Sequence, residues 1–452
     1  MSYPGHVRAI TLLGLPLIGG HLAQFAIGLT DTVMLGWYGV EALAAVTLAS
    51  SYFFVFFMLG SGFAFAVMPM VAASAAKGDE VSIRRATRMG LWLSFAFTLL
   101  VMPAMWWSAQ ILQLLGQNEE VATLAARYLR LAGWGMIPAL LVTVLKSYLA
   151  ALERTQIVLW ITLLAALANG VANYALIFGN WGAPELGIMG AAIASVLSHT
   201  VSLLAIILYA VLALPGHSLF QRLWRPDWEM FGSVFRLGLP IGLTALSEVS
   251  LFAASAMMMG WLGTIPLAAH GIAISVTSGT FMIHLGLSNV ATIRAGNAYG
   301  HQDRTHMARG AIMVIALSLL AALITSVVFL MAPVQMISLF LEADDPALSD
   351  IIAIGVGLFA AAALFQLVDS AQAIALGLLR GVQDTGIPML MAVLSYWVVG
   401  IPASYLLGFT FGMGGVGIWL GLAVGLACAG AFLMVRFWGR AIVKVGAGAD
   451  AA

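Results

Sequence analysis

Residues 14–45 of the chain, GLPLIGGHLAQFAIGLTDTVMLGWYGVEALAA, recur in altered form at residues 238–269 as GLPIGLTALSEVSLFAASAMMMGWLGTIPLAA. At a constant shift of 224 positions, both stretches have Gly-Leu-Pro at the start and Gly-Trp, Gly and Leu-Ala-Ala further on. Apolar sequences match by chance in Leu and Ala, so the shared Gly, Pro and Trp residues decide the comparison. The same shift pairs Gly62 with Gly286 without a gap. The chain therefore consists of two related halves.

The composition indicates a membrane protein. Of the 452 residues, 62% are hydrophobic and 8% are charged, whereas a soluble domain carries about 25% charged residues. A helix that crosses the hydrocarbon core needs about 20 apolar residues. Twelve apolar runs are long enough, near residues 10–35, 43–74, 88–113, 123–152, 157–179, 187–213, 233–261, 266–296, 309–340, 351–379, 386–410 and 414–438. The sequence predicts an all-α polytopic membrane protein with twelve transmembrane helices.

Each half of the chain contains six of these runs. An even number gives both halves the same orientation, which predicts two six-helix lobes related by a pseudo-two-fold axis along the membrane normal, with a central cleft. The boundary lies in the polar stretch 215–233, so the N-terminal lobe is expected at residues 1–222 and the C-terminal lobe at residues 223–452. Two lobes that rock about a cleft are typical of a transporter.

Basic residues predict the orientation, because short loops rich in Lys and Arg stay in the cytoplasm. Most of the 19 basic residues lie at the termini or in one set of loops, namely Arg8, Lys77, Arg84, Arg85, Arg88, Arg154, Arg222, Arg225, Arg236, Arg294, Arg304, Arg309, Arg380, Arg436, Arg440 and Lys444. Both termini are therefore expected in the cytoplasm, in agreement with the even helix number. The first run lacks an A-x-A-like cleavage site and is interpreted as a retained helix of the cytoplasmic (inner) membrane.

Composition and motifs argue against several classes of function. A net charge of zero provides no basic field for nucleic acid. The single cysteine, Cys428, excludes an internal disulfide framework and a multi-thiolate metal site. An intramembrane enzyme is the weaker alternative, because neither a nucleophile with its base nor a metal constellation is evident. No cofactor is expected, and the chain is predicted to be a monomer in the lipid bilayer.

Three carboxylates, Asp31, Glu248 and Asp369, lie well inside apolar runs. An ionisable group in the bilayer costs roughly 2.5–3.5 kcal/mol on insertion scales, so each one needs a reason. Under the repeat Glu248 aligns with Gln24 and Asp31 with Ser255, so each half has its own acid where the other half is neutral. An acid in an apolar interior takes up a proton more readily than in water, and two neighbouring acids strengthen that tendency or jointly hold a cation.

Sodium binding is the alternative to proton uptake, at Asp31 or at Glu248 with Asp369. A hard cation such as Na⁺ prefers several oxygen ligands from carboxylates, carbonyls and amides. Asn169 and Asn173 lie four residues apart on one face of the fifth run and could supply amide oxygens beside Asp31. A purely structural role, in which these polar side chains hydrogen-bond between helices, stays open.

Other polar residues inside the runs favour structural roles. His21, His199, His270 and His284 are isolated from one another in sequence, whereas metal sites need clustered ligands. Hydrogen bonds between helices are therefore the favoured interpretation. For Lys146 two interpretations stay open, namely pairing with an acid or extension of its ammonium group towards the interface.

Equivalent positions in the two halves indicate parts that bend or brace. Prolines interrupt the first helix of each half, and neighbours can satisfy the freed backbone groups. The tripeptides Glu-Arg-Thr at 153–155 and Gln-Asp-Thr at 383–385 occupy equivalent cytoplasmic helix ends. A polar gating cluster and simple solvated loops are both compatible with that placement. The gating or structural candidates are Pro16, Pro240, Arg154, Thr155 and Asp384.

Aromatic and methionine side chains suit a cavity that accepts varied apolar cations, through cation–π attraction and adaptable contacts. Phenylalanines gather at residues 53–57 and methionines at residues 257–259. Most such side chains face lipid or pack between helices, so each one is only a candidate. The candidates for a substrate cavity are Gln24, Phe53, Met257, His284, Asn289 and Phe365.

Several motifs together point to a known family. They are LGLP at the start of spans one and seven, Asp31 before Met-x-Gly-Trp, and LRGVQDT at residues 379–385. With twelve spans in two lobes, the chain resembles the multidrug and toxic compound extrusion (MATE) exporters over about residues 8–440. Glu248 in span seven with Asp369 in span ten resembles the NorM-type branch rather than the DinF-type branch.

The resemblance implies an antiporter. Inward flow of H⁺ or Na⁺ would drive the export of cationic, amphipathic drugs and other toxic organic compounds by rocker-switch alternating access, as in antibiotic resistance. The residues that match the ion and proton sites of the family are Asp31, Asn169 and Asn173 in the N-terminal lobe and Glu248 and Asp369 in the C-terminal lobe.

One departure from the family pattern bears on the coupling ion. Four residues before Asp369, where a sodium-coupled member has tyrosine, this chain has Phe365. The missing hydroxyl favours protons. The nearest rival function is a lipid-linked saccharide flippase of the wider superfamily. Such proteins tend to have extra helices and a strongly basic cavity, whereas these spans contain acids and the single base Lys146.

Overall fold

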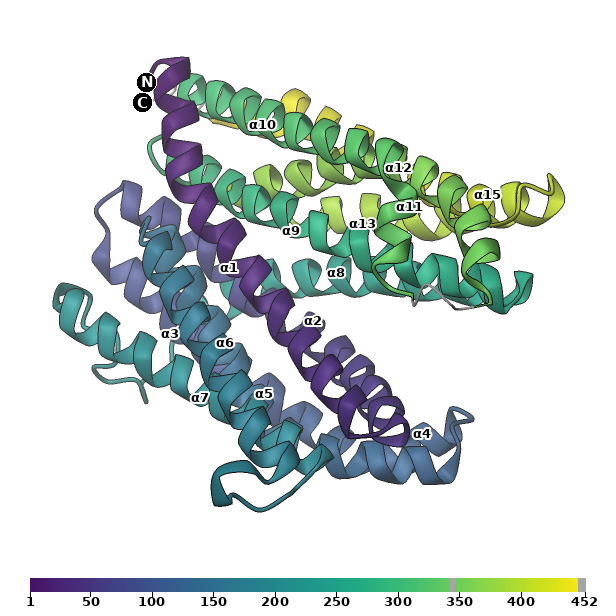
Figure 1. Cartoon of the computed structure of the whole chain (residues 1–452). Helices are drawn as coiled ribbons and strands as arrows, with labels where there is room; N and C mark the ends of the chain where they lie inside the picture. The colour runs from purple at the N-terminus through teal and green to yellow at the C-terminus, as the bar shows by residue number, and fades with distance from the viewer. Residues whose placement is uncertain (342–345, 446–452) are drawn as a thin grey trace. The chain divides into compact units, whose positions relative to one another are not determined.

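A computed structural model describes residues 1–341 and 346–445, and every regular element in them is helical. Twelve helices of the described part are long and apolar enough to cross a membrane (Figure 1). They are α1 (Tyr3–Tyr38), α2 (Val40–Ala76), α3 (Glu80–Trp106), α5 (Glu119–Ala151), α6 (Thr155–Phe178), α7 (Ile188–Ala213), α8 (Trp228–Leu262), α9 (Thr264–Gly300), α10 (Arg304–Met331), α12 (Leu348–Gly381), α13 to η4 (Gly386–Thr410) and α15 to α16 (Gly414–Lys444). The predicted fold class and the twelve spans are confirmed.

Two predicted spans each consist of a long helix and a short one. The run at 88–113 divides into α3 and α4 (Ser108–Leu114), and the run at 309–340 divides into α10 and α11 (Pro333–Ser338). Ala332 precedes a proline, which disfavours α-helical geometry at that residue, and it adopts φ −131° and ψ 37°. The break recurs at the equivalent place in both halves, so it belongs to the repeated unit.

The turns between helices repeat as the sequence does. Asp79 caps α3 by accepting a hydrogen bond from the Ser82 amide at 2.9 Å, and Asp303 caps α10 by accepting one from the His306 amide at 2.8 Å. These two pairs are related by the same shift of 224 residues. A side-chain acceptor at the N-cap satisfies an amide that has no partner inside the helix, which explains why both halves have Asp here.

The turns after α5 and α12 also share one geometry. Glu153 and Gln383 adopt left-handed φ values of 61° and 60°. In both turns that residue's amide donates to the carbonyl three residues earlier at 2.9 Å. The next amide, of Arg154 or Asp384, donates to the carbonyl five residues earlier at 2.9 Å. The two tripeptides singled out in the sequence therefore end their helices in the same way.

The chain divides into two compact units. We call Gly19–Leu243 the N-terminal unit, and Met1–Ile18 with Thr244–Ala452 the C-terminal unit. The boundaries fall inside α1, two residues after Pro16, and inside α8, three residues after Pro240. The division into lobes at residue 222, made from the polar linker, stays a prediction.

Glycines allow one helix crossing to recur in each unit. In the N-terminal unit a Cβ atom on Gly62 of α2 would lie 2.4 Å from the Gly238 oxygen and the Gly242 nitrogen of α8. In the C-terminal unit a Cβ on the equivalent Gly286 of α9 would lie 2.9 Å from the Ile18 nitrogen of α1. Small residues let helix backbones approach closely in membranes, so this crossing explains the glycine coincidences of the repeat.

Replacing Gly62 with Ala is expected to lower the stability of the purified chain markedly. The added methyl group meets rigid backbone rather than a movable side chain, and overpacking of this kind costs about 1–3 kcal/mol. Gly170→Ala in α6 is the matched control, because a Cβ there meets nothing within 4 Å. Thermal unfolding in detergent measures both variants, and equal melting temperatures would contradict the close crossing.

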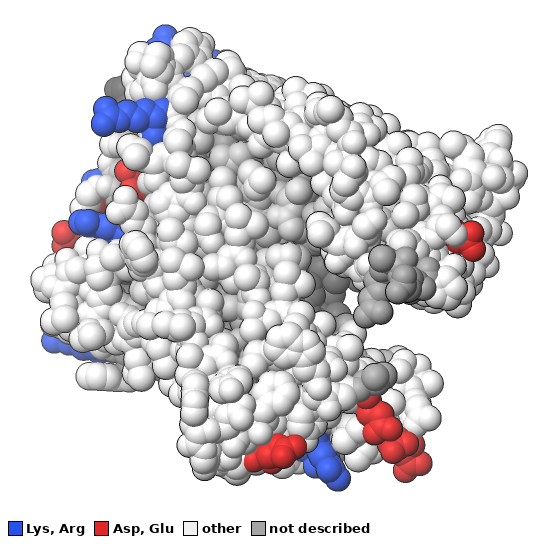
Figure 2. All heavy atoms as spheres, viewed as in Figure 1, with Lys and Arg blue, Asp and Glu red and all other residues white. Residues whose placement is uncertain are grey.

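Helix α5 is the most enclosed span of the N-terminal unit. Of its 33 residues 19 are buried, and Leu129 and Leu140 are completely inaccessible. Figure 2 shows the charged side chains of each unit at its edges, while the middle of each unit is uncharged on this face. An uncharged middle suits the hydrocarbon layer, and a central buried helix is a rigid support for polar groups inside it.

The linker between α7 and α8 is fastened to α3. Arg85 forms two hydrogen bonds with Asp227, Nε–Oδ2 at 2.5 Å and Nη2–Oδ1 at 3.1 Å. Arg88 donates to two linker carbonyls at 2.7 and 2.8 Å, and the Trp92 indole donates to another at 2.7 Å. These bonds fix the long polar stretch that joins the two halves of the sequence.

Changing Asp227 to Asn is expected to remove an acid-sensitive part of the stability. Hydrogen bonds from Arg85 hold the pKa of Asp227 below its ordinary value of 3.8. The stabilisation is therefore present above about pH 4 and is lost as the pH falls through the lowered folded-state pKa. The pair is partly exposed, so the expected loss at pH 7 is about 0.5–1 kcal/mol.

Unfolding measured at pH 7 and at pH 3 tests this expectation. The difference between the wild-type chain and Asp227→Asn should be present at pH 7 and shrink in acid. Glu119→Gln is the control, since Glu119 is exposed and forms no ion pair among residues 1–341 and 346–445. A difference that stays constant with pH would show that the Asp227 charge is not responsible.

Candidate ion-coupling sites

The N-terminal unit brings Asp31 of α1 together with two asparagines of α6. The Asn173 amide nitrogen donates to Asp31 Oδ1 at 2.5 Å and lies 3.2 Å from Asn169 Oδ1. Both asparagines are completely buried, whereas Asp31 is partly accessible. The i, i+4 spacing of the asparagines places them on one face of α6, as the sequence predicts.

A tyrosine that sequence reasoning missed lies near this cluster. Tyr128 of α5 lies within charge–charge range of Asp31 and within hydrogen-bonding reach of the Ser50 and Ser195 hydroxyls. Its side chain is 8% exposed. A lone tyrosine in an apolar run carries no signal of its own, because only the packing of α5 against α2 and α7 brings it to the acid.

The Asp31 cluster contains polar atoms without partners. Asn169 Nδ2 and Asn173 Oδ1 are sealed from solvent and make no hydrogen bond within the described part of the chain. A buried amide oxygen without a partner is costly, and it is also a ligand that a hard cation prefers. The carboxylate and the two amide oxygens therefore fit a proton or a small cation such as Na⁺.

The C-terminal unit holds the other two acids together. Glu248 of α8 and Asp369 of α12 lie within charge–charge range of each other. Asp369 is 3% exposed, and its Oδ1 is sealed without a hydrogen-bond partner among the described residues. Two acids that interact in an apolar interior disfavour the doubly ionised state unless a cation neutralises them.

Two further side chains of this acid pair were not predicted. Arg380, assigned to a loop from the sequence, lies in the last turn of α12 within charge–charge range of Glu248. Tyr396, in the π-helical turn η3 (Ser395–Gly400), is completely buried near both acids and accepts a hydrogen bond from Gln372 Nε2. π-helical turns occur frequently at functional sites.

Phe365 lies against an aromatic wall rather than at an open surface. It is 2% exposed, and its ring centroid lies 5.9 Å from that of Phe252 and 5.4 Å from that of Trp419. The Trp419 indole donates to His270 Nδ1 at 3.0 Å. In α9, His284 Nδ1 likewise lies 3.0 Å from the Ser318 hydroxyl. These two histidines make the bonds between helices that the sequence favours.

The remaining cavity candidates differ in accessibility. Gln24 is exposed, Met257 is 63% exposed, and Phe53 is partly buried and stacks on Phe57 with ring centroids 6.1 Å apart. Asn289 is 7% exposed. Gln24 and Phe53 belong to the N-terminal unit, and Met257 and Asn289 to the C-terminal unit.

The gating candidates at the helix ends have different surroundings. Asp384 accepts two hydrogen bonds from Arg436, at 2.7 Å from Nε and 3.1 Å from Nη2. Thr155 is buried at the start of α6, and Arg154 before it is exposed. The paired charges join the α12–α13 turn to the end of α15, whereas Arg154 forms no ion pair within the described ranges.

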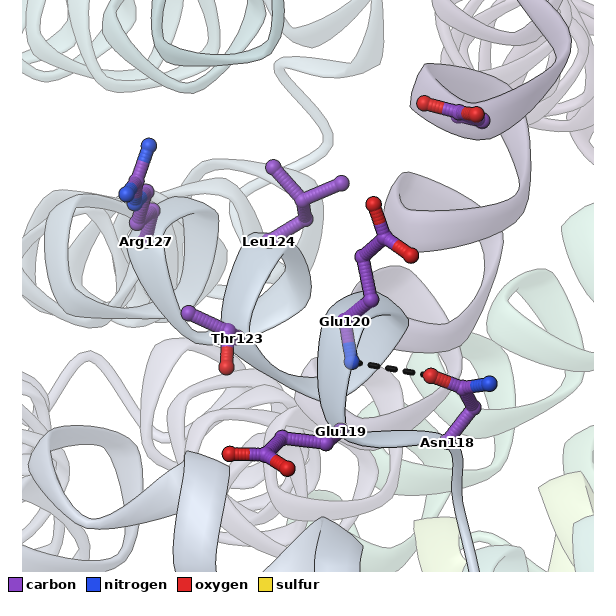
Figure 3. Close-up of a pocket in the computed structure, with 7 residues that line it drawn as sticks. Asn118, Glu119, Glu120, Thr123, Leu124 and Arg127 are labelled. Carbon is purple, nitrogen blue, oxygen red and sulfur yellow. Dashed lines mark hydrogen bonds between the residues drawn. The ribbon is translucent and has the colours of Figure 1, made fainter.

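A separate acidic pocket lies at the other end of the N-terminal unit. Its lining includes Glu41, Glu119, Glu120 and Arg127, with Asn118 capping α5 by accepting a hydrogen bond from the Glu120 amide at 2.9 Å (Figure 3). None of the predicted site residues lines it. Among the described residues no group of three or more His, Cys, Asp or Glu side chains could hold a metal ion.

Comparisons with known proteins establish the family. The family model MatE matches residues 16–175 and 240–406. A protein of Rhizobium meliloti (strain 1021) named "Probable multidrug resistance protein NorM" is 44% identical over 439 residues, which cover 97% of this chain and 94% of the relative. A relative of the same name from Agrobacterium fabrum (strain C58 / ATCC 33970) is 43% identical over 96% of this chain and 94% of its own. The chain belongs to the MATE family.

Solved MATE structures share the fold. The eukaryotic MATE transporter AtDTX14 superposes with a TM-score of 0.87 at 19% identity, over 98% of this chain and 99% of that one. An outward-facing multidrug resistance MATE family transporter gives a TM-score of 0.88 at 20% identity, over 97% and 96% of the two chains. A MATE protein is a multi-pass membrane transporter coupled to an ion, so the chain is a transporter and not an enzyme.

Proposed function

We propose that this MATE chain exports cationic, amphipathic drugs and other toxic organic compounds in exchange for H⁺ or Na⁺. The observation that carries the proposal is a partly or fully enclosed acidic cluster in each unit, Asp31 with Asn173 in one and Glu248 with Asp369 in the other. The relatives are named as probable multidrug resistance proteins, which supports the export of drugs. Small organic cations are the expected substrates.

The coupling step is neutralisation of a buried acid. When Asp31 or the Glu248–Asp369 pair holds H⁺ or Na⁺, the charge in the apolar interior is cancelled, and release exposes it again. The two states differ in electrostatic free energy, so each favours a different packing of the helices. Ion binding from one side and release to the other then drives the cycle of alternating access.

Protons are the favoured coupling ion, and sodium is the alternative. Phe365 has no hydroxyl to offer a cation, but the buried Tyr396, whose hydroxyl bonds to Gln372, interacts electrostatically with the same acid pair. In the Asp31 cluster the oxygens of the two asparagines would also serve Na⁺.

The moving parts are proposed to be two lobes, residues 1–222 and 223–452, that rock about prolines. Pro16 and Pro240 lie within three residues of the places where α1 and α8 pass from one unit to the other. A helix proline removes one backbone hydrogen bond and makes bending easier at that point. The Asp384–Arg436 bonds, together with the turn at Arg154 and Thr155, are proposed to stabilise one state of the cycle.

Charge placement supports cytoplasmic termini in the inner membrane. In the N-terminal unit, Lys77 and Arg154 lie between helices on the same side as the arginine-rich linker, while Glu41 and Glu119 lie in the first turns of α2 and α5, on the other side. Basic loops stay in the cytoplasm. The chain is proposed to work as a monomer, with Gln24, Phe53, Met257, His284, Asn289 and Phe365 near the path of the substrate.

Transport into inverted membrane vesicles tests the function. Vesicles that contain the chain should accumulate a fluorescent organic cation when the lumen is acidic or rich in Na⁺, and vesicles without the chain should not. Imposing one gradient at a time identifies the ion. Failure of both gradients to drive accumulation would refute the proposal.

A further inference from the structure

We propose that His6, Arg294 and His306 form a pH-sensitive latch, which holds the first turns of α1 against α9 and α10 while both imidazoles are neutral. Acid that protonates either imidazole releases those turns. The three residues belong to the C-terminal unit and lie at the helix ends proposed to face the cytoplasm. The latch adds a form of regulation to the proposed export function and uses none of the coupling acids.

Arg294 bridges the two histidines. Its Nη2 atom lies 2.8 Å from His306 Nε2 and 3.3 Å from His6 Nδ1, and the two imidazole centroids are 4.6 Å apart. His6 is completely buried, and Arg294 is 9% exposed. A Cβ on Gly310 of α10 would lie 3.5 Å from His6 Nδ1. These contacts join the start of α1 to the end of α9 and to the start of α10 (Figure 1).

The bonds define the protonation state of both histidines. A guanidinium group donates hydrogen bonds and cannot accept them, so His6 Nδ1 and His306 Nε2 must accept from Arg294 and carry no proton. A protonated imidazole has an N–H at both nitrogens. Protonation of either histidine therefore removes a hydrogen bond to Arg294 and places two cations in contact.

The surroundings of the imidazoles are mainly basic. The charged and titratable groups within charge–charge range of one or both are Arg294, His301, Asp303, Arg309 and the amino group of Met1. Asp303 is exposed, and its Oδ1 already accepts a hydrogen bond from the His306 amide at 2.8 Å. Because water screens an exposed carboxylate, Asp303 offsets only part of the repulsion that a protonated imidazole would meet.

Few buried contacts hold the first turns of α1. Among residues 3–10 only His6 and Ile10 are buried, and Arg309 adds an exposed hydrogen bond and a cation–π contact. His6 Nε2, which carries the proton, is sealed from solvent without a hydrogen-bond partner in the described part of the chain, which is costly. A segment with so few buried contacts opens locally at a small cost in free energy. Loss of an Arg294 bond is therefore enough to release it.

Release of the latch affects transport through α1 itself. The helix begins in the C-terminal unit and continues into the N-terminal unit, where it carries Asp31. Rigid helices transmit displacements between distant sites. When the first turns of α1 are loose, a displacement at Asp31 is no longer passed in full to the C-terminal unit. An acidified cytoplasm is therefore expected to slow export.

Hydrogen exchange in the purified full-length chain tests the latch. Mass spectrometry follows the amides of residues 5–10 at pH 7.5 and at pH 5, a range that includes the ordinary pKa of histidine, about 6.5. Each rate is divided by the intrinsic exchange rate at that pH. Protection should fall about tenfold in acid, as loss of one charge-assisted bond predicts. Protection that does not change with pH would overturn the proposal.

Variants identify the groups that titrate. His6→Asn places an amide oxygen near the position of Nδ1, and His306→Gln places one near the position of Nε2, so the double variant keeps both acceptors and should retain its protection at pH 5. Arg294→Gln removes the donor and should have low protection at both pH values. His301→Asn changes an exposed histidine of the same turn and should respond to acid as the wild-type chain does. Loss of protection in acid by the double variant, or full protection in Arg294→Gln, would contradict the latch.

Inverted vesicles measure the effect on transport, which rests on the proposed export function. Their cytoplasmic face meets the buffer, which is set at pH 7.5 or pH 5 under the same driving gradient. In acid, uptake of a fluorescent organic cation by the wild-type chain should slow at least about twofold more than uptake by the double variant, the change expected when half of the molecules are released. Equal slowing would refute the regulatory role. If neither chain took up the cation, the export proposal would fail and the exchange measurement alone would decide the latch.

Discussion

Changing Asp31 to Asn is expected to abolish ion-driven efflux while leaving the fold intact. Asn keeps the size of the side chain and can still bond to Asn173, whose amide nitrogen lies 2.5 Å from Asp31 Oδ1. It cannot bind H⁺ or Na⁺ through a negative charge. Losing one charge-assisted interaction corresponds to roughly 10- to 100-fold, so the initial rate of gradient-driven uptake into inverted vesicles should fall at least about tenfold.

The control for this variant is Asp79→Asn. Asp79 caps α3 at its N-terminus, and Asn is an equally good N-cap, so the same chemical change outside the membrane should leave transport unchanged. Hydrogen bonds from Ser82 hold the pKa of Asp79 below its ordinary value, so this acid stays ionised and takes no part in proton uptake. Wild-type rates in Asp31→Asn would remove Asp31 from the coupling mechanism.

Most of the fold could be predicted from the sequence because it follows from local rules. Twenty-residue apolar runs must become helices in lipid, where every backbone group needs an internal partner. The repeat then fixed the number of spans in each half. The breaks at Trp107 and Ala332 were missed, since a hydropathy pattern continues across a turn that stays apolar.

Sequence reasoning also missed two wide turns in the eleventh span, which lies in close contact with a neighbouring helix. Residues 395–400 and 406–410 form π-helical turns inside the eleventh span. There a Cβ on Gly425 of α15 would lie 2.7 Å from the Gly400 Cα atom. A glycine in a sequence does not reveal which other helix it lies against, so neither the contact nor the wider turn could be anticipated.

The acids of the candidate site were visible in the sequence, and their partners were not. An ionisable residue in an apolar run stands out because its burial is costly. Tyr128 and Tyr396 look like ordinary aromatic residues of a span, and only the packing of separate helices brings them to Asp31 and to Glu248. Arg380 was assigned to a loop because it ends an apolar run, where basic residues mark cytoplasmic ends.

Changing Asp369 to Asn is expected to lower ion-driven efflux and, at the same time, to raise the melting temperature. Asp369 is 3% exposed, its Oδ1 has no partner among the described residues, and Glu248 lies within charge–charge range. Holding a second acid there costs free energy that the neutral amide avoids. Relief of about 1 kcal/mol raises the melting temperature of a chain of this size by roughly 1 °C.

For Asp384→Asn, in the turn that follows the same helix, we expect a lower melting temperature instead. Asp384 accepts two hydrogen bonds from Arg436, so loss of its charge leaves the guanidinium without its partner and lowers the melting temperature. A residue that is retained for function can lower the stability of the folded chain, whereas a residue with a structural role raises it. If Asp369→Asn lowered both efflux and melting temperature, Asp369 would serve to hold the helices together, and coupling in the C-terminal unit would fall to Glu248 alone.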